Sequence, residues 1–168
     1  MILFLDFDGV LHAVDDDDNL PASQRHFYRA PLLRDLLRRL PQIRVVVVSA
    51  WRLDHRLESL ANFVVGQAPD SEELRSRFIG ITPELDPAQL NRILKIPYGM
   101  RLAEIEAWCN ANNYEGPWIA LDDKPSLFFQ SAAEEADYAA RGQRLIVCDP
   151  QRAMEPWHVE HIVRYAQQ

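Results

Sequence analysis

The chain has 168 residues, of which 48% are hydrophobic and 26% are charged, and its net charge is −7 at pH 7. This length and composition are typical of one globular domain, residues 1–168, with a substantial buried core. No apolar run approaches the roughly 20 residues of a membrane-spanning helix, and the acidic net charge argues against a surface built mainly to bind nucleic acid.

The first predicted element is a strand that begins almost at the first residue and ends in two carboxylates, Asp6 and Asp8. Side chains at positions i and i+2 of a strand point the same way, so both carboxylates are expected in one space, where they can hold a cation. Gly9 lets the backbone turn away after them. The alternative is a surface strand end with two solvated acids. No secretory signal carries acids at these positions, so we interpret the start as structural.

After an acidic loop at residues 15–18, which we expect to be a solvated turn, residues 31–40 are predicted to form a helix. Four consecutive valines, residues 45–48, then indicate a central parallel strand that is buried on both faces. Ser49 follows this strand. A hydroxyl and backbone amides at such a position are suited to bind a phosphate oxygen, while the alternative is an ordinary helix cap.

The middle of the chain is predicted to form a helix at residues 53–63, a strand at 78–81 and an irregular connection at 82–97 with one short helix. A helix at residues 100–112 leads to a short apolar strand, which ends in Asp122 and Asp123. Asp is also a favoured N-cap before a proline-containing first turn. Both roles can coexist, with Asp123 capping a helix while Asp122 binds metal.

A helix at residues 126–140, a strand at 144–148 and a final helix at 156–166 complete the chain. Alternating strands and helices predict an α/β fold with a mainly parallel sheet and helices on both faces. The carboxyl ends of parallel strands share one edge, so the four acids are expected to converge there. Carboxylates packed together repel each other, and a hard cation such as Mg²⁺ would relieve this repulsion.

These stretches resemble the haloacid-dehalogenase-like (HAD) superfamily of phosphohydrolases and phosphotransferases over most of the chain. The first family motif, Asp-x-Asp-Gly, is similar to residues 6–9, the second-motif hydroxyl to Ser49, and the fourth-motif acids to Asp122 and Asp123. The stretches Leu-Asp-x-Asp-Gly-Val-Leu, Ser-x-Trp-Arg and Leu-Asp-Asp most resemble the small domains of Swiss-army-knife RNA-repair proteins. Residues 79–83 and 148–150 are also similar to parts of that subgroup.

The resemblance implies a three-layer α/β/α Rossmann-like HAD fold and a phosphatase that forms an aspartyl-phosphate on Asp6. Asp8 would be its general acid/base. Mg²⁺ would be held by Asp6, the backbone carbonyl of Asp8 and Asp122, with Asp123 helping. Ser49 and a cation would bind the phosphoryl group. Arg101 fits that cation by its position and Lys95 is the runner-up, and the alternative for either is a solvated charge on a helix surface.

The connections are too short for a large cap domain. An open site would suit a large phosphorylated substrate, such as an RNA or DNA end or a protein, unless another domain or subunit covers it. Trp51, His12, His26 and Tyr28 are expected near its mouth, with His12 as a surface residue. The basic segments at residues 34–39 and 52–56 are expected to be solvated helix faces. Cys109 and Cys148 are predicted to be core thiols, which favours a reducing cytoplasm.

Two other interpretations of the sequence remain. One is a catalytically silent relative that uses the acidic pocket as a Mg²⁺-linked binding or regulatory module. The other is a two-component receiver domain, which also has a parallel sheet with acids and a hydroxyl residue. In a receiver the acidic pair is expected near the amino end and the phosphoacceptor on a middle strand, whereas here an acidic pair comes late in the chain.

Overall fold

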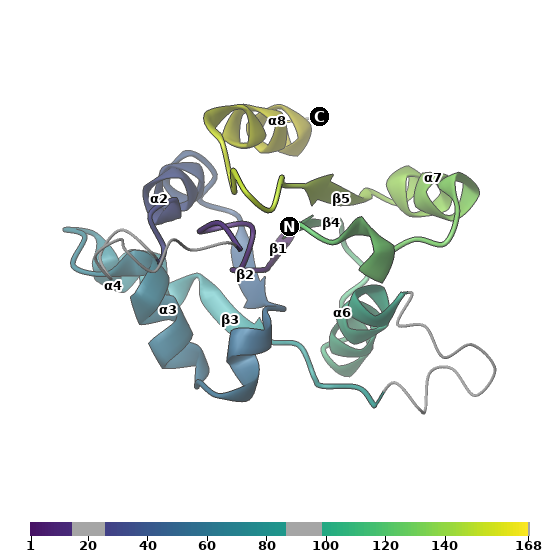
Figure 1. Ribbon diagram of the computed structural model, residues 1–168, viewed down its shortest axis with the longest axis horizontal. Helices are drawn as coiled ribbons and strands as arrows, with labels where there is room; N and C mark the ends of the chain where they lie inside the picture. The colour runs from purple at the N-terminus through teal and green to yellow at the C-terminus, as the bar shows by residue number, and fades with distance from the viewer. Residues whose placement is uncertain (15–25, 87–98, 168) are drawn as a thin grey trace.

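A computed structural model describes residues 1–14, 26–86 and 99–167 of the chain. The described residues form one five-stranded sheet in the order β3-β2-β1-β4-β5, and all its neighbouring strands pair in parallel (Figure 1). The α/β class with a parallel sheet is thereby confirmed. The strands are β1 (Ile2–Leu5), β2 (Arg44–Val47), β3 (Phe78–Ile81), β4 (Trp118–Asp122) and β5 (Gln143–Val147).

Helices cover both faces of this sheet, as the alternation along β1 requires. Leu3 and Leu5 point into a core shared with α2, α3 and α8, whereas Ile2 and Phe4 point into a second core shared with α6. The result is the predicted three-layer α/β/α arrangement. The helices are α2 (Ala30–Arg39), α3 (Leu57–Val65), α4 (Ser71–Ser76), α6 (Met100–Ala111), α7 (Ala132–Ala140) and α8 (Pro156–Ala166), with short 3₁₀ helices η1 (Ala50–Leu53) and η2 (Pro125–Leu127).

Two helix predictions need correction, and one helix was not predicted. The helix predicted at residues 126–140 is divided into η2 and α7, because the Ser131 side chain accepts a hydrogen bond from Glu134 N and starts a new helix there. The helix predicted at 53–63 is likewise divided into η1 and α3. Helix α4 was not predicted, and its Leu74 packs into the core beneath α3. The predicted loop at 15–18 lies outside the described residues. The predicted connection at 82–97, with its short helix, lies mostly outside them.

The pairing of β1 decides where the functional residues lie. Leu5 is in register with Val47 of β2 and with Leu121 of β4. The carboxyl ends of these three strands therefore meet at one edge of the sheet, and the residues that follow them emerge side by side. This adjacency confirms the prediction that the first strand and the strand before Lys124 end together.

The cysteines lie where the sequence predicted them, because Cys109 and Cys148 are both free and buried. Burial raises the pKa of Cys109 to about 11 and that of Cys148 to about 12, so neither thiol is reactive at neutral pH. Within the described parts of the chain, no helix has the length and apolar character needed to cross a membrane.

Candidate active site

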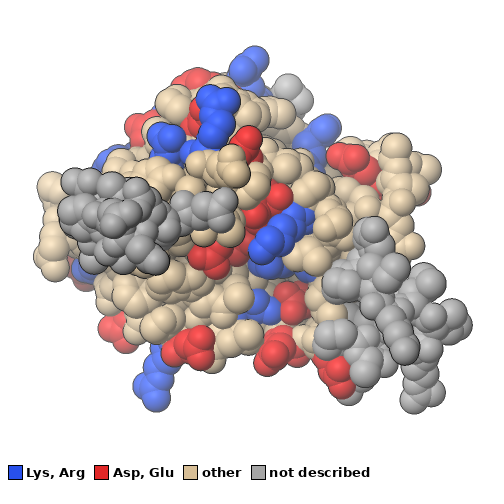
Figure 2. All heavy atoms as spheres, in the orientation of Figure 1, with Lys and Arg blue, Asp and Glu red and all other residues tan. Residues whose placement is uncertain are grey.

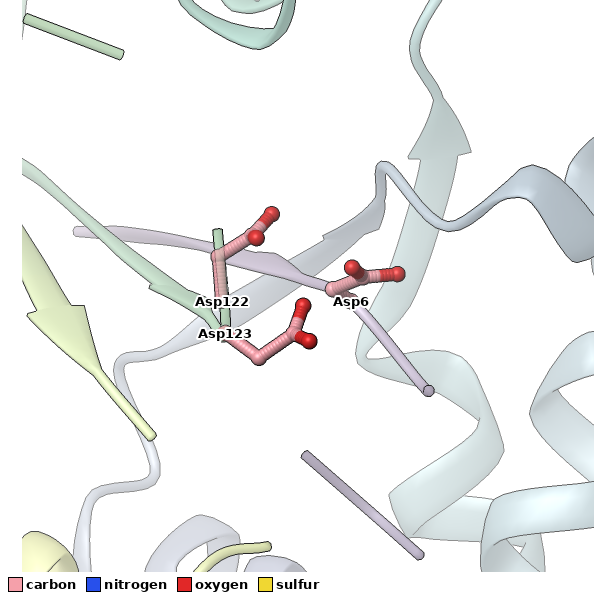
Figure 3. Close-up of side chains that lie close together, drawn as sticks. All are labelled: Asp6, Asp122 and Asp123. Carbon is pink, nitrogen blue, oxygen red and sulfur yellow. The ribbon is translucent and has the colours of Figure 1, made fainter. Parts of the chain in front are cut away.

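Three carboxyl groups meet at the edge where β1 and β4 end. Asp6 follows β1, Asp122 is the last residue of β4, and Asp123 comes directly after it. Each residue offers a carboxylate oxygen within 4.8 Å of the other two (Figure 3). Asp6 is 2% exposed, Asp122 is fully buried and Asp123 is 8% exposed. Such burial shows that Asp6 is not a solvated acid at a surface strand end, which was the alternative interpretation.

This arrangement is electrostatically unfavourable in the absence of a cation. Burial first, and then the nearby charge of Asp6, raise the pKa of Asp122 from 3.8 to about 7. Burial also raises the pKa of Asp123. Moreover, Asp122 Oδ2 and Asp123 Oδ1 are buried and have no hydrogen-bond partner. Unpartnered, converging carboxylate oxygens are the donor set that a hard divalent cation prefers, so these residues fit Mg²⁺.

Arg101, near the beginning of α6, reaches the same group of acids. Its Nη2 lies 3.6 Å from Asp6 Oδ2 and its Nη1 lies 3.6 Å from Asp122 Oδ2, while Nη1 also donates a hydrogen bond to Val48 O. Burial by itself would lower the pKa of Arg101, but Asp6 and Asp122 raise it on balance. Arg101 is therefore a buried cation at the site and not a solvated helix-surface charge. Lys95, its runner-up, lies outside the described residues.

The side chain of Asp8 does not join the three converging acids, which corrects the expectation that four would converge. Strand β1 ends at Leu5, so the i, i+2 alternation no longer holds at Asp8. Asp8 Oδ1 is bonded to His12 Nε2 at 2.9 Å and accepts a hydrogen bond from Trp51 Nε1 at 3.0 Å. The hydrogen bond with His12 is the main cause that lowers the pKa of Asp8. His12 is 2% exposed, so the expectation that it is a surface residue was wrong.

The turn after Asp8 packs directly on the acidic group. Gly9 has φ +71°, and a Cβ at this position would lie 2.6 Å from Asp123 Cβ. Only glycine therefore allows the loop to lie so close to Asp123. The capping role expected of Asp123 is not seen, because Asp122 Oδ1 accepts the hydrogen bond from Lys124 N at 2.9 Å, and η2 has no side-chain cap.

Ser49 lies at the same edge, after β2, and is fully buried. Its hydroxyl is 3.5 Å from Trp51 N and caps η1, as the alternative interpretation proposed. Arg52 holds this turn in place: it donates to Val48 O at 2.6 Å, to Ser49 O at 3.0 Å and to Thr82 O at 3.1 Å. Arg52 is buried, so the expectation of a solvated charge at this position was wrong.

Glu104 of α6 is the partner of Arg52. The two side chains form an ion pair of 2.7 Å, and both are almost completely buried. Burial raises the pKa of Glu104. Arg52 contacts the residues after β2 and β3, and its partner Glu104 lies on α6, one helical turn after Arg101. The pair therefore fixes the position of Ser49 relative to Arg101. Neither partner was predicted as part of the site. The only signal was the Ser-x-Trp-Arg stretch, which includes Arg52.

The sequence matches the family described as "HAD domain in Swiss Army Knife RNA repair proteins" over residues 2–159. The chain belongs to this HAD family. The match confirms the resemblance inferred from the motifs, and the family suggests a phosphatase-type hydrolase. Comparisons with curated proteins and with solved structures gave no match.

The raised pKa of Asp122 in this HAD domain predicts a stability that depends on pH. The folded protein holds a proton on Asp122 between pH 3.8 and about 7, whereas the unfolded chain has lost it. The contribution of Asp122 to the free energy of unfolding therefore decreases as the pH rises through this range. Asp122→Asn removes this dependence and keeps the acceptor for Lys124 N.

We expect the variant to gain stability over the wild type as the pH rises from 4 to 8 in the presence of a chelator. Urea unfolding at several pH values measures the difference. Mg²⁺ binds the ionised carboxylates and should reduce this difference at pH 8. A difference in unfolding free energy that is the same at every pH would contradict the titration assigned to Asp122.

Proposed function

We propose that the protein is a Mg²⁺-dependent phosphohydrolase that acts on a phosphomonoester through an aspartyl-phosphate on Asp6. The observation that carries this proposal is the buried group of Asp6, Asp122 and Asp123, in which two carboxylate oxygens have no hydrogen-bond partner and the Arg101 guanidinium lies 3.6 Å from both Asp6 and Asp122. Membership of the HAD family supports it. Mg²⁺ would be held by Asp6, Asp122 and the backbone carbonyl of Asp8, with Asp123 assisting, and it would neutralise charge on the phosphate.

In the first step, a carboxylate oxygen of Asp6 attacks phosphorus. The new bond to Asp6 forms as the bond to the ester oxygen breaks, and the leaving oxygen receives a proton from Asp8. In the second step, water attacks the phosphorus of the aspartyl-phosphate and gives its proton to Asp8, which releases phosphate and restores the Asp6 carboxylate. Arg101 and Ser49 would hold the phosphoryl oxygens throughout.

Asp8 must be protonated to act as an acid. In the free protein, however, the hydrogen bond with His12 lowers the pKa of Asp8 and so favours its ionised form. A bound phosphate places negative charge beside this carboxylate, which raises its pKa. We therefore infer that Asp8 takes up a proton as the substrate binds. His12 and Trp51 hold the Asp8 carboxylate outside the acidic group, where it would be free to act on the ester oxygen of a bound substrate.

We further propose a phosphorylated nucleic-acid end as the substrate class, because the family description names RNA repair proteins. Lys, Arg, Asp and Glu side chains are mixed across the described part of the face in Figure 2, so we do not propose binding of a long nucleic acid through charge alone. We also propose that residues 1–168 form one domain. A partner domain or subunit would cover the open site. The two free thiols would reflect a cytoplasmic location.

The test of this function is phosphate release from p-nitrophenyl phosphate and from RNA phosphorylated at its 3′ or 5′ end. We expect release in Mg²⁺, a fall to background in EDTA, and recovery when excess Mg²⁺ is returned. The absence of release from every ester in Mg²⁺ would overturn the proposal and favour the catalytically silent binding module.

A further inference from the structure

Aromatic rings surround Trp51 on the side of the site that holds Asp8. The ring centroid of Trp51 lies 5.2 Å from that of Phe27, 5.7 Å from that of His55 and 5.8 Å from that of Phe63. Phe27 and Phe63 stack at 5.6 Å with an interplanar angle of 24°. We refer to Phe27, Trp51, His55 and Phe63 as the aromatic wall. Phe7, His12 and His26 pack around Trp51 as well.

The aromatic wall is not a closed part of the core. Phe63 is 40% exposed, His55 is exposed, and Trp51 and Phe27 are each partly exposed. A group of exposed rings beside a polar site is unusual for a surface with only a structural role, because each ring leaves apolar area in water. His55 adds ring nitrogens that donate or accept hydrogen bonds. Such a surface is suited to contact a flat heterocyclic ring.

Trp51 belongs to the aromatic wall and also contacts Asp8, the proposed general acid. Its Nε1 donates to Asp8 Oδ1 at 3.0 Å and lies 3.2 Å from Oδ2. If Asp8 protonates the leaving oxygen, that oxygen lies within hydrogen-bond distance of Asp8. Because Trp51 contacts both oxygens of Asp8, the leaving alcohol would lie within reach of the Trp51 ring.

We propose that the aromatic wall is the subsite for a nucleobase on the leaving alcohol, so that the substrate is a nucleoside phosphate or the nucleotide at a chain end. This inference rests on the proposed function. A ring bonded directly to the leaving oxygen, as in phosphotyrosine, would lie against Asp8 and Trp51. A nucleobase lies one sugar further from phosphorus, and the exposed rings of His55 and Phe63 contact Trp51, the ring of the wall that is hydrogen-bonded to Asp8.

Stacking of one base on an aromatic side chain changes affinity by about tenfold or more. We therefore expect the wild type to prefer adenosine 3′- or 5′-phosphate over glycerol 3-phosphate, which has the same phosphate and no ring. The ratio of the two kcat/KM values should fall about tenfold in Phe63→Leu, which keeps an apolar side chain against Phe27. Phe63→Tyr keeps the ring and should keep the ratio.

Trp157 provides the matched control, because it is a 52% exposed aromatic residue on α8. Trp157→Ala should leave the ratio unchanged. The subsite is overturned if Phe63→Leu lowers kcat/KM equally for both esters, if it lowers phosphotyrosine hydrolysis as much as adenosine phosphate hydrolysis, or if Trp157→Ala has the same effect.

Calorimetric binding of adenosine 5′-phosphate in Mg²⁺ separates this inference from the proposed function. Hydrolysis of all esters without a preference for the ring would overturn the subsite alone. If no ester is hydrolysed, the proposed function fails, and the subsite is still tested: tighter binding to the wild type than to Phe63→Leu supports it, and equal binding overturns it.

Discussion

Asp6→Asn is expected to abolish Mg²⁺-dependent phosphate release while the protein stays folded. Asparagine has nearly the same shape, and its oxygen can still accept the hydrogen bond from Phe7 N, which is 2.8 Å long in the wild type. The amide is not a nucleophile, however, and it is a weaker ligand for a hard cation. Loss of an enzyme's nucleophile can lower kcat by about 10⁶-fold.

The stability of Asp6→Asn distinguishes loss of chemistry from loss of fold. The variant removes one negative charge beside Asp122 and Asp123, so its free energy of unfolding in EDTA should equal or exceed that of the wild type. Asp70→Asn, in the connection before α4, is a matched change that should keep activity. Phosphate release by a stably folded Asp6→Asn at the wild-type rate would contradict the assignment of Asp6 as nucleophile.

Asp8→Asn is expected to have the second-largest effect, a loss of about 10² to 10⁴-fold in kcat for an alkyl phosphate. The amide oxygen can still accept the hydrogen bond from Trp51, so the loop should stay in place. What is lost is the proton for the leaving oxygen and the base for the attacking water. The nitrophenolate ion leaves without a proton, so the first step with p-nitrophenyl phosphate should suffer much less than with an alkyl ester.

The second step needs a base whatever the leaving group is. Asp8→Asn should therefore release a burst of about one p-nitrophenol per site and then accumulate protein that carries one phosphoryl group. Rapid mixing measures the burst, and mass spectrometry after an acid quench measures the phosphorylated protein. An equal loss of first-turnover rate for alkyl and nitrophenyl esters would show that Asp8 is not the acid.

A buried ion pair, Arg52–Glu104, lies at the same edge of the sheet as the three acids. Three acids lie together at the ends of β1 and β4, and Arg52 and Arg101 both donate a hydrogen bond to Val48 O next to the end of β2. Arg101 faces the acids, while Arg52 is paired with Glu104 and is directed toward the backbone of β2 and β3. Removing one partner would leave an uncompensated buried charge. Because Arg52 also donates to Ser49 O, the ion pair helps to position Ser49.

Most of the fold was predictable because its signals are local. The valines of β2 and the apolar run of β4 indicated buried parallel strands, and the final helix was predicted at the residues where α8 lies. The helix ends were less predictable. The predicted long helix after Asp123 failed because a single side-chain hydrogen bond, from Glu134 N to Ser131, starts a new helix.

The candidate site was predicted in part for the same reason. Asp6 directly follows β1 and Asp122 is the last residue of β4, so parallel pairing was sufficient to place them together. The positions of Asp8 and His12 depend on how the chain turns at Gly9, and those of Arg52 and Glu104 depend on how α6 packs against η1. Asp8 was predicted from its motif, but its contacts were not. Arg52 was expected to be a solvated charge and Glu104 was not singled out, because their burial depends on neighbours that only the fold supplies.

The sequence by itself determined which apolar runs form strands that lead into acids, and where a glycine follows the first acidic pair. Its motifs were also sufficient to identify the HAD family. Only the tertiary structure decided that three acids and not four converge, that Trp51 and His12 hold the fourth, and that an aromatic wall stands beside it. The physical reason is that alternation and motif spacing act within a few residues, whereas these contacts join segments that meet only when the sheet is assembled.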